Sequence, residues 1–146
     1  MAEKKSKVLE ELDDKTHVEK EKIIREKVKN KKYKRSQFRE VTQAFKDDAD
    51  ILLAIIESLR LAEVSVDNIT KKQLDTFNRA CSTAEKVIND PNSKEQAKVE
   101  ALKLINDAYR FVTAVNLTAI IVICFLITSG LAVIALLAVI AIKANE

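Results

Sequence analysis

Apolar residues recur at helical spacing in three segments of the chain, each with charged residues on the opposite face. The pattern predicts helices over residues 36–62, over residues 71–89 and from Ser93 onward. Three amphipathic helices joined by short loops pack antiparallel in a bundle. We therefore predict an all-α fold, with an antiparallel three-helix bundle over residues 36–112.

Local signals mark where these helices begin and end. Ser36 is a candidate N-cap, and Thr70 with Gln73 has the spacing of a capping box, as does Ser93 with Gln96. The sequence Asp90-Pro91-Asn92 breaks the chain between the second and third helices. An up-down-up order places the end of the third helix beside the connection 63–69. It places the start of the first helix at the opposite end.

Residues 111–142 contain no charged side chain. A helix needs about 20 apolar residues to cross the hydrocarbon core of a bilayer. The densest part, residues 117–142, would reach about 39 Å at the helical rise of about 1.5 Å per residue. We predict that the third bundle helix continues as a transmembrane helix over residues 113–142, followed by a short tail, 143–146. Representative span residues are Leu117, Ile121, Phe125, Gly130, Leu136 and Ile140.

Lysine and arginine flank this stretch mainly on its N-terminal side, which favours a single-pass membrane protein with a cytosolic N-terminal domain. Four residues follow Ile142, so we expect insertion after synthesis, the tail-anchored arrangement. Whether the stretch crosses once or folds back at Ser129 and Gly130 stays open. Small residues favour close helix contacts in lipid. The candidates for a helix-association face are Thr128, Ala132, Ala135 and Ala138.

The N-terminal residues, 1–35, differ from the predicted bundle. They have a helix-forming composition but a thin apolar stripe, made of Val8, Leu9, Leu12, Ile23, Ile24 and Val28. We predict a charged, Lys-rich arm, helical or flexible, that is solvated rather than part of the core. If the arm pairs at all, a short coiled coil is the expected form.

A basic run crosses from this arm into the predicted bundle, without an acidic residue between positions 27 and 39. Its cations are Lys27, Lys29, Lys31, Lys32, Lys34, Arg35 and Arg39. A solvated linker, a surface for anionic lipid or acidic protein, and a surface for nucleic-acid phosphates are the open interpretations, with nucleic acid ranked last. The predicted bundle places this run away from the anchoring membrane, where it would suit a second membrane or a partner.

Residue types that carry catalysis or bind metals are scarce. His17 is the single histidine, and no cysteine or carboxylate pair stands near it at metal-ligand spacing. Asp47, Asp48 and Asp50 cluster, but on a helix they diverge around the axis. The one glycine, Gly130, excludes phosphate-binding glycine motifs. We predict no enzyme activity, no metal, no cofactor and no small-molecule substrate.

The layout resembles that of tail-anchored adaptors and tethers, including SNARE-type proteins and some secreted bacterial effectors. The leading hypothesis is a membrane-anchored scaffold that presents its bundle and basic arm to protein or lipid partners, as an oligomer or within a larger complex. The alternative is a membrane-active or pore-forming subunit that oligomerises through the apolar C-terminal helix. Membrane lipid is a partner in both.

Overall fold

Six helices make up the part of the chain that the computed structural model describes, residues 6–64, 66 and 69–114. No strand occurs among these residues, so the all-α class is confirmed there. The predicted count of three bundle helices is wrong. The helices are α1 (Lys7–Asp13), α2 (His17–Lys29), α3 (Arg35–Ala44), α4 (Ala49–Glu63), α5 (Lys71–Asn89) and α6 (Glu95–Val112).

The predicted first helix, residues 36–62, is two helices, because the chain reverses between Phe45 and Asp48. The Asp48 carboxylate accepts a hydrogen bond from the backbone N–H of Ile51 at 3.1 Å and so caps α4. Aspartate side chains bond to nearby backbone and favour such caps over helix interiors. The predicted N-cap also shifts, since the helix begins at Arg35 rather than after Ser36.

The second predicted helix has the predicted bounds, and the capping box of Thr70 with Gln73 is confirmed. The second predicted capping box is wrong. The Ser93 hydroxyl donates to the carbonyl of Val87 at 2.8 Å, so it fastens the end of α5 instead of capping α6. α6 begins at Glu95, with Lys94 in the N-cap position.

α6 ends at Val112, so the prediction of one unbroken rod from this helix into residues 113–142 is wrong at its start. The Thr113 hydroxyl donates to the carbonyls of Tyr109 and Arg110, at 2.8 and 3.3 Å. The Tyr109 carbonyl still accepts from the backbone N–H of Thr113 at 3.1 Å, as in a helix. The N–H of Ala114 donates to the carbonyl of Phe111 at 3.3 Å rather than to that of Arg110, so the helical pattern stops there.

Residues 7–33 belong to the common core, which corrects the prediction of a solvated arm. Helical structure was one of the two predicted forms and is what the structure shows. Thr16 and Glu19 form a capping box at the start of α2. The buried residues of this segment are Val8, Leu12, Ile24, Val28 and Tyr33.

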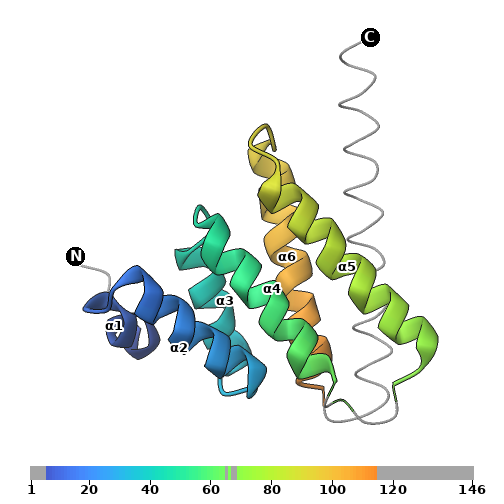
Figure 1. Cartoon of the computed structure of the whole chain (residues 1–146), viewed down its shortest axis with the longest axis horizontal. Coiled ribbons are helices and arrows are strands. Elements are labelled where there is room, and N and C mark those ends of the chain that lie inside the picture. The colour runs from blue at the N-terminus through green and yellow to red at the C-terminus, as the bar shows by residue number, and fades with distance from the viewer. Residues whose placement is uncertain (1–5, 65, 67–68, 115–146) are drawn as a thin grey trace.

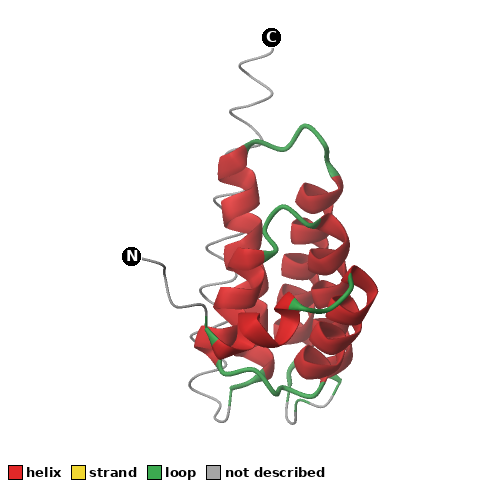
Figure 2. Ribbon diagram, turned by 90° about the vertical axis from the view of Figure 1, so that its left-hand side faces the viewer, coloured by secondary structure: helices red, strands yellow, loops and turns green. Residues whose placement is uncertain are grey.

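The helices form two layers (Figure 1). α2, α4 and α5 lie side by side in one layer, and α1, α3 and α6 lie side by side in the other. α2 and α4 run parallel, since His17 pairs with Asp48 near their starts and Arg25 pairs with Glu57 further along. The chain is thus a stack of three helical hairpins, and connections gather at both ends of the stack (Figure 2).

α5 and α6 are antiparallel, as predicted, and the rings of Phe77 and Phe111 stack with centroids 5.3 Å apart. Phe77 lies early in α5 and Phe111 at the end of α6. The start of α5 therefore lies at the same end of the stack as the end of α6, as the up-down-up order predicted (Figure 1).

The burial of α2 gives a direct test of the corrected fold. Ile24 is fully buried, so Ile24→Ala should lower the free energy of unfolding by about 2–5 kcal/mol. The control is Val18→Ala in the same helix, at a side chain that is 75% exposed, where a change below about 0.5 kcal/mol is expected. Chemical denaturation monitored by circular dichroism measures both. Equal, small effects would mean that α2 is not part of the core.

Candidate functional site

The basic run covers the end of α2, the connection to α3 and the start of α3. α2 ends in a Schellman motif, in which the N–H of Lys32 donates to the carbonyl of Lys27 at 2.8 Å and that of Lys31 to Val28 at 3.1 Å. Lys31 has a φ of 56°, in the left-handed region that glycine normally fills. The turn gathers five cations into what we call the basic corner: Lys29, Lys31, Lys32, Lys34 and Arg35.

The basic corner is fastened to the last turns of α6. The Tyr109 hydroxyl donates to the backbone carbonyl of Tyr33 at 2.5 Å, and its ring stacks on Phe38 with centroids 4.0 Å apart. Arg35 Nε donates to Thr113 Oγ1 at 3.5 Å. The corner therefore lies beside the end of α6, where the described chain stops.

This position overturns the predicted one, which put the basic run at the end of the bundle farthest from the end of α6. The cause is the reversal at Asp48. One long helix would have carried the start of α3 to the opposite end, whereas two antiparallel helices bring it back beside the ends of α4 and α6 (Figure 1).

The seven predicted cations divide into three groups. Lys27 makes contacts within the fold, since its ammonium pairs with Glu11 at 2.5 Å and lies 5.5 Å from the centroid of the Tyr33 ring. In the corner, Lys31 is partly buried, and Lys29, Lys32, Lys34 and Arg35 are exposed. Arg39 is exposed too, but it lies along α3 and lines a groove instead.

The groove of Arg39 runs between α3 and α6 and has a volume of about 370 Å³. Both signs of charge line it, with Arg39, Lys46, Lys98, Lys103 and Arg110 facing Asp47, Glu95 and Asp107. Burial raises the pKa of Asp107, against the opposing effect of Arg110 at 3.5 Å. Because residues of both signs line it, the groove lacks the uniform positive field of the basic corner.

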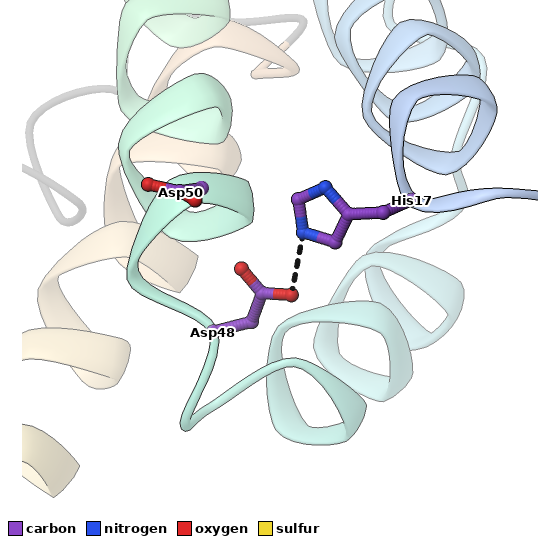
Figure 3. A group of neighbouring side chains, drawn as sticks. All are labelled: His17, Asp48 and Asp50. Atoms are coloured by element: carbon purple, nitrogen blue, oxygen red, sulfur yellow. Dashed lines mark hydrogen bonds and ion pairs between the residues drawn. The ribbon is translucent and has the colours of Figure 1, made fainter.

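A second group of polar side chains lies where α2 and α4 begin (Figure 3). His17 Nε2 is 3.0 Å from Asp48 Oδ2, and one carboxylate oxygen of Asp50 completes a set whose members lie within 4.8 Å of one another. The His17 side chain is 50% exposed and that of Asp48 is 28% exposed. Two carboxylates and an imidazole that meet in this way are potential metal ligands.

Sequence analysis missed this group, because His17 and Asp48 are 31 positions apart and only the parallel packing of α2 on α4 joins them. One signal was present. Apolar residues cover α4 on more than one face, and a helix of that kind needs neighbours on several sides. The N-terminal residues were the remaining candidates for such a neighbour.

The buried thiol and phenols do not supply a nucleophile. Burial raises the pKa of Cys81 to about 12, so the thiolate that would react is scarce at neutral pH. Burial also raises the pKa of Tyr33, and that of Tyr109 to about 12. Tyr109 therefore keeps the proton that it donates to the Tyr33 carbonyl.

No protein-family model, no curated protein and no solved structure matches this chain. Among the described residues, no helix combines the length and apolar character that crossing a membrane requires. From residue 115 onward the predicted transmembrane helix lies outside the described residues, and so does its helix-association face, Thr128, Ala132, Ala135 and Ala138.

The two tyrosines at the corner make a matched pair for mutation. Tyr109→Phe leaves the Tyr33 carbonyl without its hydroxyl donor and should lower the free energy of unfolding by about 1–3 kcal/mol. The Tyr33 hydroxyl is buried without a hydrogen-bond partner in the described part of the chain. Tyr33→Phe should therefore leave stability unchanged or raise it by up to about 1 kcal/mol. Thermal and urea unfolding measure both, and the reverse order would contradict the packing described here.

Proposed function

We propose that this chain is a membrane-anchored helical scaffold, in which residues 117–142 cross a bilayer and the helical domain stays on its cytosolic side. In this proposal the basic corner faces the anionic headgroups of the same membrane. The observation that carries the proposal is the position of the corner beside Thr113, within the uncharged stretch and four residues before Leu117, where its densest apolar part begins. Cations so close to a membrane contribute about 1 kcal/mol each to binding anionic lipid.

The start of α3 adds to the positive field of the corner. The N-terminus of a helix carries a partial positive charge, which acidic residues in the first turn commonly offset. The first turn of α3 has no acidic residue and instead begins with Lys34 and Arg35. A lipid phosphate or carboxylate at this position would be attracted both by the two side chains and by the helix dipole.

The proposed orientation leaves the far end of the stack away from the membrane. That end holds the α3–α4 connection, the α5–α6 connection and the start of α6. It also holds exposed lysines, of which Lys46, Lys86 and Lys94 serve as an internal comparison for the basic corner. If only one end of the stack contacts anionic lipid, the two sets of lysines should differ in their rates of chemical modification within a single sample.

The orientation can be tested by lysine acylation of the full-length chain in vesicles, read by mass spectrometry. In vesicles with 30% phosphatidylserine, we expect Lys29, Lys32 and Lys34 to react about three- to fivefold more slowly than in phosphatidylcholine alone. Rates at Lys46, Lys86 and Lys94 should not change. High salt should raise the slowed acylation rates back to their values in phosphatidylcholine, because it screens exposed charges. Equal protection of both sets would rule out the proposed orientation.

A pair of charge-matched variants repeats the test without chemical labelling. Anionic vesicles should raise the unfolding temperature of the full-length chain relative to neutral ones. Replacing Lys32, Lys34 and Arg35 by glutamine should abolish this difference, whereas the same replacement of Lys46, Lys86 and Lys94 should leave it. If only the variant at Lys46, Lys86 and Lys94 lost this difference in unfolding temperature, the opposite end of the stack would be the one that contacts anionic lipid.

The anchor has a separate test. Ile121→Arg with Leu136→Arg places two charges in the proposed span, where each costs up to about 2.5–3.5 kcal/mol, the value at the centre of a membrane helix. Alkaline carbonate should extract this variant from the membrane fraction, whereas the unaltered chain should stay in it. The control is Val18→Arg with Leu61→Arg, at side chains that are 75% and 53% exposed, and carbonate should not extract this control variant.

A dye-release experiment tests the pore-forming alternative. Vesicles that contain the unaltered chain should retain a trapped dye, and leakage of the dye would support a pore.

A further inference from the structure

The group of His17, Asp48 and Asp50 is separate from the basic corner and lies at the other end of α2 (Figure 3). His17 is the first residue of α2, Asp48 caps α4 and Asp50 lies in the first turn of α4. The group therefore joins the first hairpin of the stack to the second. It is also open to solvent, since His17 and Asp50 are exposed.

The donor set matches a particular class of ion. Two carboxylates carry the charge that balances a divalent cation, and neutral imidazole is a ligand for zinc and its neighbours among the transition metals. Magnesium and calcium prefer oxygen donors alone. A set of one nitrogen and two carboxylates therefore favours a first-row transition ion such as Zn²⁺.

The distances suit one ion bound by all three side chains. Zinc binds histidine nitrogen and carboxylate oxygen at about 2.0–2.2 Å. Two donors that are 3.0 Å apart, as His17 Nε2 and Asp48 Oδ2 are, would subtend an angle of about 90° at such an ion. Donors on one tetrahedral zinc ion lie about 3.4 Å apart. One oxygen of Asp50 lies within 4.8 Å of a ligand atom of each of the other two side chains, so the Asp50 side chain has to turn inward by up to about 1.5 Å to complete the site.

Asp48 is oriented before any ion arrives. Its Oδ1 accepts from the backbone N–H of Ile51, which fixes the carboxylate and leaves Oδ2 directed at His17. Hydrogen bonds of this kind to a ligating carboxylate strengthen metal sites, because they hold the ligand in place. The hydrogen bond that caps α4 therefore also fixes the orientation of one proposed ligand, the Asp48 carboxylate.

The geometry points to a binding site for a first-row divalent transition ion, tested with Zn²⁺, formed by His17 Nε2, Asp48 Oδ2 and an oxygen of Asp50. Water fills the remaining coordination positions. The bound ion links the start of α2 to the start of α4 and so holds the first hairpin against the second. Its effect is structural, and it does not depend on the membrane contact of the basic corner.

Isothermal titration of Zn²⁺ into the full-length chain in a non-ionic detergent tests the site. The Cys124→Ser background removes a thiol that would compete for zinc. We expect one saturable site per chain and, at a tenfold excess over Kd, a rise in the unfolding temperature of about 3 °C or more. Mg²⁺ at the same concentration should give no rise. Absence of saturable binding below 1 mM Zn²⁺ would overturn the inference.

Three variants assign the ligands. His17→Gln and Asp50→Asn should each weaken Zn²⁺ binding at least tenfold, and their metal-free unfolding temperatures show whether the fold is intact. Asp47→Asn removes a neighbouring carboxylate outside the set and should not change the affinity. Unchanged affinity in His17→Gln, or an equal loss in Asp47→Asn, would show that the zinc binds elsewhere or through carboxylates in general.

Discussion

The reversal of the chain at Asp48 sets the arrangement of every other helix. Its carboxylate accepts from the N–H of Ile51, starts α4 and separates it from α3. With two antiparallel helices in place of one, α4 comes to lie parallel to α2 and α3 antiparallel to α6. Both groups of polar side chains described above follow from this reversal, since it brings Asp48 to His17 and Arg35 to Thr113.

The packing around Tyr109 then fixes the basic corner against α6. The ring stacks on Phe38 and the hydroxyl bonds to the carbonyl of Tyr33, so one side chain joins α6 both to α3 and to the connection before it. The Schellman motif at Lys31 turns the chain sharply at the same place. The cations thus project from a backbone that is packed against the core, which would reduce the backbone entropy lost in the proposed contact with lipid.

The sequence predicted the helical class and the whole of the second helix. The capping box of Thr70 and Gln73 marks the start of α5, and Asp90-Pro91 marks its end. The reversal at Asp48 was less visible. Phe45 and Leu52 continue a helical spacing, although three aspartates stand between them. The N-terminal helices were missed for another reason. Their apolar stripe is thin, and its burial follows from the apolar surface of α4 rather than from its own composition.

The end of α6 at Val112 bears on how a domain of this kind can move. A helix that continued unbroken would impose its own axis on whatever follows and would transmit any tilt directly. The described helix instead ends at Val112, and the Thr113 hydroxyl bonds back to the carbonyl of Tyr109. In the proposed membrane-anchored arrangement, the axis of α6 would therefore not fix the tilt of the domain above the bilayer, and the charge of the lipid headgroups would set it.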